Sequence, residues 1–504
     1  MKRISKILPA MLAMILLLSI ALSSCGVLGG KEETQESTAP SDVVEPGNTE
    51  SETEPFPELE VVDLGGRNIN ILWPELHGDG HYVHNEIAVT ETKGDVIDMA
   101  VATRNAIVER AYNVKITSET LFVSDIPGRV DTDTTAGAIP EYDAIVSSIN
   151  NKNMISIMQK GLLYDFNDLL YYEESHPWWN HELMEDLSMA GARYFATGDI
   201  IYSDDFYPYC TYVNMTVSEM NGLADDYYQM VTNKTWTLEE FHNRAKVGVT
   251  ADYNKDCDTW DDFEIAGALV NENFARATYY SAGKGMIGFN ANGDPEWQMT
   301  VSYTLPILEK VSHLVLDNNA CYNVGQWNNH AIREVNLFNG NKGLFLVEEL
   351  IIAERVTKSQ NAAEFKILPF PLYEEGGEYI SVLNDAAVLG IPINTEEIDE
   401  VGLVLSAMSR ESVSTLTPAF FETVLAQRYT QDVDSVKALE IILNSTVAPD
   451  VATLQDKDWG KFMAQFKKLA FEGSTDFASY YESNISVANG KLAEYKDLLA
   501  IHGK

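Results

Sequence analysis

Short apolar segments alternate with helical segments along most of this chain, and this alternation restricts the folds that the chain can adopt. The stretches RNINILWPE (67–75), YDAIVSSIN (142–150) and AAVLGIPIN (386–394) have the length and composition of buried strands. Between the first two, the apolar residues of VIDMAVATRNAIVERAY (96–112) recur at helical spacing. Strands that alternate with helices predict α/β domains in which helices cover both faces of each sheet.

One further helix has a recognisable start in the sequence. In the stretch KTWTLEEFHNRAKVG (234–248), Thr237 is followed three residues later by Glu240, which is the spacing of a capping box. Leu238 and Phe241 lie on one face of the predicted helix. We therefore predict that a helix begins directly after Thr237.

The N-terminal part of the chain has the pattern of an export and anchoring signal. A positively charged start precedes an apolar run that is slightly short of the about 20 residues of a membrane span. The stretch Leu22-Ser23-Ser24-Cys25 that follows resembles the bacterial lipobox. Residues 1–24 are therefore predicted to be a lipoprotein signal peptide, with Cys25 as the lipidated residue. An ordinary secretory signal and an uncleaved anchor are the alternatives.

The next segment, residues 25–62, is predicted to be an acidic, disordered tether. It is rich in Glu, Ser, Thr and Pro and has few large apolar side chains, so it cannot bury enough surface to offset the entropy cost of ordering. A lipid on Cys25 together with this tether would hold the rest of the chain at the extracytoplasmic face of the cell membrane.

Composition and missing motifs argue against several classes of function. The formal net charge is −41 at pH 7, and such a surface repels nucleic acid and anionic lipid. HELMED (181–186) starts like a zinc-protease motif but has Glu185 where the second histidine would stand. No nucleophile elbow and no complete phosphate-binding loop occur, so we predict that the protein is not an enzyme. Free thiols are predicted for Cys210, Cys257 and Cys321, which form no metal-binding pattern.

Several short stretches follow one another in a characteristic order from about residue 64 onwards. They are GDVIDMAVATRNAIVERAYNVKI, EYDAIVSS, GLLYDFNDL, HPWWN, ARYFATGDI, KTWTLEEF, NKGLFLVEEL, FKILPFPLYEEGGEYIS and SVSTLTPAFFETVLAQRYTQD. In this order they resemble the extracellular solute-binding lipoproteins of bacterial ABC importers, in the large carbohydrate-associated, family 1-like branch. The resemblance implies a two-lobe, periplasmic-binding-protein-like α/β fold with a hinge and an interlobe cleft for the ligand.

The same resemblance implies a domain organisation and a function. Residues 63–203 and 384–429 would form the first lobe, and residues 204–383 and 430–504 the second. The protein would capture a carbohydrate, in the first instance an oligosaccharide, and deliver it by hinge closure to the membrane subunits of an ABC permease. A peptide or other solute receptor of the same fold is one alternative, and a surface glycan-active enzyme is a less favoured one.

A sugar ligand needs hydrogen-bonding side chains for its hydroxyl groups and an aromatic ring for its C–H faces. In α/β sheets such side chains lie in the loops beyond the carboxyl ends of strands. Residues of these types at predicted strand ends, crossovers or breaks in an apolar run are the candidate ligand-binding residues: Trp73, Glu75, Ser148, Trp178, Trp179, Asp204, Glu348, Asn384 and Asp385. Of the two adjacent tryptophans, we expect one in the core and one at the ligand.

The sequence DYNKDCDTWDDFE partly matches a calcium-binding loop. Asp252, Asn254 and Asp256 stand at the first three ligand spacings of an EF-hand. Cys257 replaces the glycine at the sixth position, and Glu264 fits as the terminal ligand only with one inserted residue. The favoured interpretation is an acidic surface loop and a protein without a cofactor, with calcium bound by these oxygen-bearing residues as the alternative.

Overall fold

The computed structural model describes most of the chain after residue 56. Residues Val61–Lys504 form one compact unit. The described residues are 57–75, 85–92, 94–150, 152–202, 207–223, 226–248, 265–317, 320–326, 330–359, 361–421 and 433–502. Within these ranges no helix is long and apolar enough to cross a membrane. The predicted signal peptide, the lipidation site at Cys25 and nearly all of the predicted tether lie outside them.

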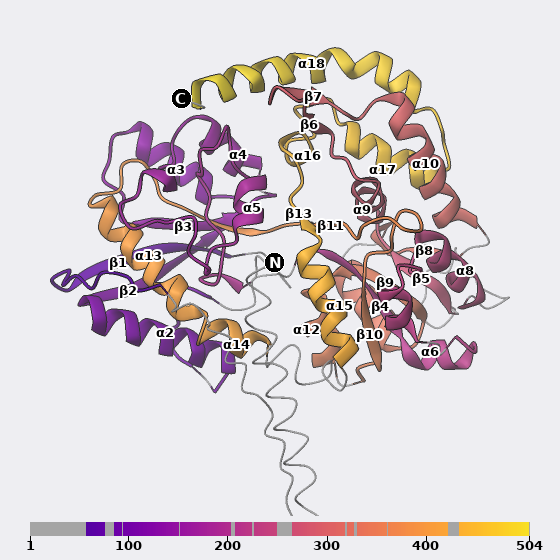
Figure 1. Ribbon diagram of the computed structural model, residues 1–504, viewed down its shortest axis with the longest axis horizontal. Coiled ribbons are helices and arrows are strands. Elements are labelled where there is room, and N and C mark those ends of the chain that lie inside the picture. The colour runs from indigo at the N-terminus through magenta and orange to yellow at the C-terminus, as the bar shows by residue number, and fades with distance from the viewer. Residues whose placement is uncertain are drawn as a thin grey trace, which may run out of the picture. The chain divides into compact units, whose positions relative to one another are not determined.

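The first sheet has four strands and contains the first strand predicted from the sequence. β1 (Arg67–Glu75) pairs in parallel with β2 (Val114–Phe122) on one side and with β3 (Ala144–Ser148) on the other. β12 (Ala387–Gly390) is antiparallel to β3, so the order across the sheet is β12-β3-β1-β2. Figure 1 labels β1, β2 and β3 of this sheet. A late segment of the chain therefore returns to complete a sheet that an early segment begins.

The longest helix beside this sheet begins where a side chain satisfies its free backbone groups. α2 (Val96–Tyr112) follows Asp95, whose carboxylate accepts hydrogen bonds from the backbone N–H groups of Ile97 and Asp98. Its buried face includes Val101, as the helical spacing of its apolar residues predicts. The other helices that accompany the first sheet are α3 (Ile126–Thr135), α4 (Lys152–Gln159), α5 (His181–Asp186), α13 (Ile398–Ser412) and α14 (Leu416–Phe421).

The second sheet has five strands. β9 (Gly343–Glu349) lies at its centre, between the antiparallel strand β4 (Tyr209–Asn214) and the parallel strand β5 (Ala266–Val270). β10 (Phe365–Pro369) extends the sheet beyond β4, and β8 (Cys321–Asn323) extends it beyond β5. Every residue of β9 is buried, which explains why its apolar run shows no alternation with polar residues.

The helix start predicted at Thr237 is confirmed in the second part of the chain. α8 spans Leu238–Gly248, and the backbone N–H of Glu240 donates to the hydroxyl of Thr237 at 3.1 Å. Phe241 packs in the core, with its ring centroid 5.0 Å from that of Phe345. The other helices that accompany this sheet are α6 (Met215–Met220), α7 (Tyr227–Thr232), α9 (Asn273–Ser281), α10 (Val301–Leu316), α11 (His330–Asn339), α12 (Ile352–Lys358), α15 (Val433–Asn444), α17 (Phe462–Glu472) and α18 (Phe477–His502).

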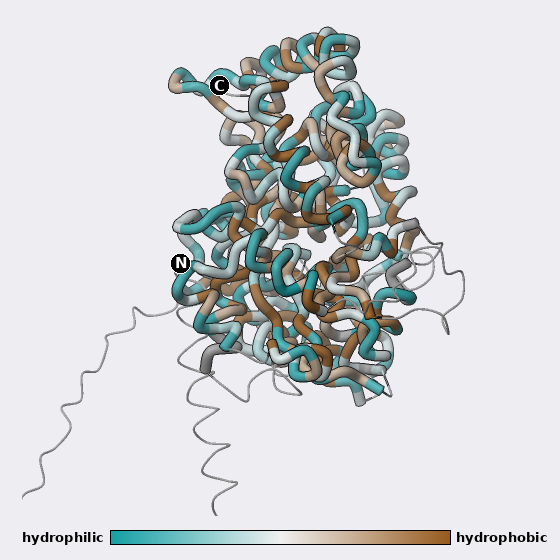
Figure 2. The backbone as a smooth tube through the Cα atoms, turned by 90° about the vertical axis from the view of Figure 1, so that its right-hand side faces the viewer, coloured by the Kyte–Doolittle hydropathy of each residue, from teal (hydrophilic) through white to brown (hydrophobic). Residues whose placement is uncertain are grey.

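Each sheet has its own hydrophobic core, and the two cores meet at the C-terminal helices. Figure 2 shows hydrophobic segments concentrated in the interior, while hydrophilic segments are frequent in the outer helices and loops. Val451 and Leu499 are partly buried hydrophobic residues that pack against both cores. Cys210 and Cys321 are buried free thiols, as predicted, whereas Cys257 lies outside the described residues.

Three chain segments pair with one another where the chain passes between the two sheets. β11 (Ser381–Val382) pairs in parallel with β13 (Thr446–Val447), and Leu383 forms an antiparallel bridge with Pro208. The backbone N–H of Leu383 also donates to the carbonyl of Val447 at 3.0 Å. Because these connections are short and rely on a few backbone hydrogen bonds, they have the character of a hinge. The lobe boundaries predicted near residues 203 and 384 fall close to them and stay predictions.

The two tryptophans of the stretch HPWWN pack closely beside the first sheet. Gly198 has φ 154°, and a Cβ at this position would lie 2.2 Å from the carbonyl oxygen of Trp178. Trp179 pairs with Gly198 in an isolated antiparallel bridge, and the ring of Trp178 stacks on that of His176 with centroids 4.2 Å apart. Glycine is required here because any side chain would overlap with the neighbouring backbone.

We predict that Gly198→Ala destabilises the protein and that Gly490→Ala, in the exposed interior of α18, does not. The first change places a Cβ against the Trp178 carbonyl at an unfavourable φ, which should lower the free energy of unfolding by at least about 2 kcal/mol. The second meets no atom within 4 Å and replaces a helical glycine, which should add about 0.5–1 kcal/mol. Urea unfolding followed by circular dichroism measures both, and equal stability of the two variants would contradict the packing described.

Candidate ligand-binding site

A polar cluster lies where strand ends of the two sheets approach one another. Glu348 lies at the end of β9, Asn271 follows β5, and Ser148 ends β3. Asn384 and Asp385 stand between β11 and β12, directly after the crossover. In open α/β sheets the ligand binds beyond the carboxyl ends of strands, so a binding site is expected here. We name this group the junction cluster, and its members are Ser148, Asn271, Arg276, Glu334, Glu348, Glu349, Asn384 and Asp385.

Asn384 connects residues from both parts of the chain. Its Oδ1 accepts a hydrogen bond from the Arg276 guanidinium, and its Nδ2 donates to the Glu349 carboxylate. The side-chain amide of Asn150 donates to the Asn384 carbonyl, and the Asn384 backbone N–H donates to the carbonyl of Tyr207 at 3.0 Å. One residue therefore contacts the loop after β3, helix α9, strand β9 and the crossover.

Asp385 and Ser148 form the part of the cluster that belongs to the first sheet. The Ser148 hydroxyl lies 2.6 Å from Oδ1 and 2.8 Å from Oδ2 of Asp385, to which it donates. The backbone N–H of Ala386 donates to Asp385 Oδ1 at 2.8 Å. The structure thus brings together four residues that were selected from the sequence: Ser148, Glu348, Asn384 and Asp385.

Three glutamates of the cluster are buried. Glu334, on α11, is 1 % exposed, Glu348 is 4 % exposed and Glu349 is 2 % exposed. Burial, followed by the charge of Glu349, raises the pKa of Glu334 to about 8. Burial also raises the pKa of Glu348 well above its usual range, and the charges of Glu334 and Glu349 add to this shift. Glu334 and Glu348 are hydrogen-bonded to each other, and burial favours the protonated form of both.

Two polar atoms of the cluster have no hydrogen-bond partner among the described residues. They are Oε2 of Glu334 and Nε of Arg276, and the Arg276 residue is 7 % exposed. A buried polar atom without a partner costs about 1–3 kcal/mol, so folded proteins leave few of them. Either atom could therefore form a hydrogen bond with a bound polar molecule.

Among the described residues, the others that were selected from the sequence do not join the cluster. Trp178 and Trp179 are 0 % and 1 % exposed, so both rings are core residues, in place of the expected division between core and ligand. The reason is that Gly198 and neighbouring aromatic rings enclose them. Trp73 is buried in β1, and Glu75 is exposed at its end. Outside the described residues lie Asp204 and the predicted calcium ligands Asp252, Asn254, Asp256 and Glu264.

The sequence interpretation did not select Asn271, Arg276 or Glu334. Asn271 directly follows the buried strand β5, so the strand-end rule that selected Ser148 also applies to it. Arg276 and Glu334 lie on the buried faces of α9 and α11. A charged residue at a buried helical position was the available signal, but the sequence does not show which buried charges meet one another.

A cavity of about 360 Å³ lies elsewhere, between α4 and the C-terminal helices. Gln159 of α4 faces Gln455, which follows α16 (Val451–Leu454), and their side-chain amides are 3.4 Å apart. Lys491 and Tyr495 of α18 contribute to the walls. No member of the junction cluster lines this cavity, and it is not at the end of a strand. The junction cluster is therefore the candidate ligand-binding site.

Comparison with known proteins identifies the fold. No family model and no curated protein matches the chain. Among solved structures, an ABC substrate-binding protein from Listeria monocytogenes in complex with cycloalternan has a TM-score of 0.55 at 13 % identity, over 84 % of this chain and 99 % of that chain. The galacto-N-biose-/lacto-N-biose I-binding protein of an ABC transporter from Bifidobacterium longum, in complex with lacto-N-biose, has a TM-score of 0.55 at 13 % identity, over 86 % of this chain and 98 % of that chain.

A third solved structure has a ligand of another kind. UgpB from Mycobacterium tuberculosis, in complex with glycerophosphocholine, has a TM-score of 0.54 at 11 % identity, over 86 % of this chain and 99 % of that chain. All three are similar to this chain over nearly their whole length. The two-lobe, periplasmic-binding-protein-like α/β fold predicted from the sequence is therefore confirmed.

We predict that Glu334 makes the folded protein less stable as the pH rises. A glutamate in the unfolded chain loses its proton near pH 4.5, whereas Glu334 in the folded chain keeps its proton until about pH 8. Between these values the folded state binds more protons, so the free energy of unfolding falls by up to about 1.4 kcal/mol per pH unit through this group. Glu334→Gln removes this contribution, and the variant should be more stable than the unchanged protein at the upper end of the range.

Urea unfolding between about pH 5 and 8 tests this prediction. The slope of the free energy of unfolding against pH is proportional to the difference in bound protons between the unfolded and folded states. Glu482→Gln, on the exposed face of α18, is the matched control and should keep the slope of the unchanged protein. An unaltered slope in Glu334→Gln would mean that Glu334 is ionised in the folded state.

Proposed function

We propose that the protein captures a carbohydrate in the junction cluster and delivers it to an ABC importer. The observation that carries this proposal is the group of buried, incompletely paired polar side chains at the strand ends of both sheets. A sugar hydroxyl both donates and accepts hydrogen bonds, so it suits both the Glu334 carboxyl group, protonated or ionised, and the donor Nε of Arg276. The oligosaccharide ligands of two solved structures with this fold support the same class of ligand.

The cluster has enough polar groups for a specific small ligand. A hydrogen bond contributes about 1 kcal/mol net, or about 1.5–3 kcal/mol when one partner is charged. Micromolar affinity corresponds to about 8 kcal/mol, so several such bonds must converge on the ligand. Carboxyl groups, amides and the guanidinium of Arg276 together supply both donors and acceptors. A bound sugar would replace some of the contacts that these side chains make with one another.

Ligand access requires the two sheets to separate, because the cluster residues are nearly all buried. β11, β13 and the bridge between Leu383 and Pro208 connect the two parts and would bend as the hinge. Contacts of Asn384 with Arg276 and Glu349 would break on opening and re-form around the ligand. The closed, ligand-bound form is then the form that permease subunits would recognise.

The place of action follows from the N-terminal sequence. A lipid on Cys25 and the acidic tether of residues 25–62 would keep the binding domain at the extracytoplasmic face of the membrane. Ligand capture next to a membrane permease needs no chemical step, which agrees with a sequence that lacks catalytic motifs. The support for the anchor is the sequence pattern alone.

A second candidate ligand is a polar solute with a positive charge. The cluster contains three buried glutamates and one arginine, so a cationic group could take the place of the protons that burial favours on Glu334 and Glu348. The glycerophosphocholine complex of one solved structure with this fold favours the same alternative. A peptide is the other alternative ligand for a protein of this fold. It would bind through its backbone and amino terminus.

We predict that one class of neutral mono- or oligosaccharide stabilises the protein in a thermal-shift assay. A ligand at 100 times its dissociation constant that binds only the folded state adds about 2.7 kcal/mol to the free energy of unfolding. Asn384→Ala removes a donor and an acceptor from the cluster and should weaken sugar binding by at least about tenfold, or about 1.4 kcal/mol. Asn336→Ala, at an exposed position of α11, is the matched control and should bind as the unchanged protein does.

Small-angle scattering with the stabilising ligand tests the mechanism, because closure should lower the radius of gyration. Stabilisation by glycerophosphocholine or by short peptides, with no response to any sugar, would replace the carbohydrate by one of these classes. A bound sugar without any change in the radius of gyration would contradict hinge closure but not sugar binding.

A further inference from the structure

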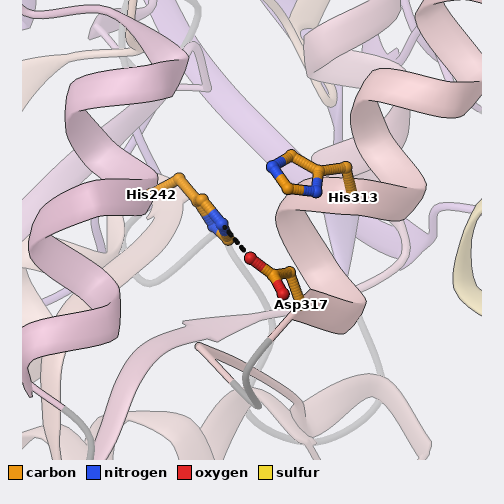
Figure 3. A group of neighbouring side chains, drawn as sticks. All are labelled: His242, His313 and Asp317. Atoms are coloured by element: carbon orange, nitrogen blue, oxygen red, sulfur yellow. Dashed lines mark hydrogen bonds and ion pairs between the residues drawn. The ribbon is translucent and has the colours of Figure 1, made fainter.

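Two histidines and an aspartate meet between α8 and α10, and none of them belongs to the junction cluster. His242 lies on α8, His313 lies in the last turn of α10, and Asp317 caps the end of that helix. Figure 3 shows the three side chains grouped in the space between the two helices. The helices α8 and α10 are far apart in the sequence, so only their packing against each other brings the three side chains together.

The geometry of the group is largely set by the fold. His242 is 0 % exposed, and its Nε2 lies 3.1 Å from Oδ2 of Asp317. The ring centroids of His242 and His313 are 4.8 Å apart. Three atoms able to bind a metal, one from each side chain, all lie within 4.8 Å of one another. His313 and Asp317 are four residues apart, which places them on the same side at the end of α10.

We propose that His242, His313 and Asp317 form a binding site for a divalent transition-metal ion such as Zn²⁺. Zinc bonds to imidazole nitrogen and carboxylate oxygen are about 2.0–2.2 Å long, so tetrahedral ligand atoms lie about 3.3 Å apart. The His313 side chain is exposed and can rotate. A rotation that moves its ring nitrogen by about 1.5 Å would bring the three atoms to this separation. Water would occupy the fourth position.

The donor set decides which class of metal can bind. Two imidazoles and one carboxylate suit Zn²⁺, Ni²⁺, Co²⁺ and Cu²⁺. Calcium and magnesium prefer six or more oxygen ligands, which this place does not supply. The site is thus distinct in chemistry from the acidic loop that begins at Asp252, for which calcium is the candidate ion.

The surroundings of the three residues both favour and limit metal binding. The C-terminal end of α10 carries partial negative charge, which attracts a cation. Lys246, one turn after His242 on α8, has its Nζ 4.0 Å from Oδ2 of Asp317 and repels a second cation. Nδ1 of His242 has no hydrogen-bond partner within the described ranges, and a metal-bound imidazole without such a partner binds about 10–100-fold less tightly. We therefore expect micromolar affinity.

A metal ion in this position would connect two helices that pack on the second sheet. α8 contacts β5 and β9, and α10 contacts β8. The ion would raise the stability of this part of the chain and would take no part in ligand recognition. Metal binding at this place is therefore independent of the proposed function.

Isothermal titration with zinc chloride tests the proposal on the full chain without a polyhistidine tag. His77, His81 and His84 are replaced by asparagine in all samples, so that this group of neighbouring histidines does not compete. We expect one zinc ion per chain with micromolar affinity, no response to calcium or magnesium, and an increase in melting temperature with zinc. His313→Asn should weaken zinc binding by at least about tenfold and leave the fold intact, because the side chain is exposed.

Two charge variants separate specific ligation from general attraction of cations. Glu309→Gln, exposed on α10 one turn before His313, removes a negative charge and should leave zinc affinity unchanged. Lys246→Gln removes the opposing positive charge and should strengthen zinc binding several-fold. X-ray absorption at the zinc edge should report imidazole nitrogen and oxygen as the nearest neighbours. Zinc affinity that His313→Asn leaves unchanged, or that Glu309→Gln weakens as strongly, would overturn the proposal.

Discussion

The hydrogen bonds of Asn384 connect the two halves of the fold at its most polar point. An amide side chain has a donor end and an acceptor end, and here the acceptor faces the Arg276 guanidinium while the donor faces the Glu349 carboxylate. Rotation of the amide by half a turn would set donor against donor and acceptor against acceptor. A single orientation of this residue therefore ties strand β9, helix α9 and the crossover together.

The acidic content of the junction cluster is costly for the folded chain without ligand. Carboxyl groups that are 1–4 % exposed lose most of their hydration, and the chain responds by raising the pKa of Glu334 and Glu348. The core around Trp236, by contrast, is apolar, and the indole N–H there donates to the carbonyl of Pro369 at 3.0 Å. Departures from good packing and pairing gather at functional sites, which supports the junction cluster as the candidate site.

Local sequence pattern decides some features of this chain, and packing between distant segments decides others. The strands, the helix start at Thr237 and the fold class follow from periodicity and capping, which act over a few residues. Ser148 and Asp385 were both selected from the sequence and the structure pairs them, while their role in ligand binding stays a prediction. In the sequence, the tryptophans of HPWWN cannot be distinguished from rings that stack on a ligand. Their burial depends on the segment around Gly198, which lies 20 residues further along the chain.

The sequence by itself determined the α/β architecture, the acidic surface, the predicted export signal and the absence of a catalytic motif, because each of these depends on composition or on short-range pattern. The tertiary structure alone decided which polar residues meet. Arg276 and Asn384 are 108 positions apart, and His242 and Asp317 are 75 positions apart. Such contacts form only when helices and strands pack in three dimensions, since local propensity contains no information about which distant side chain completes a hydrogen bond or a metal site.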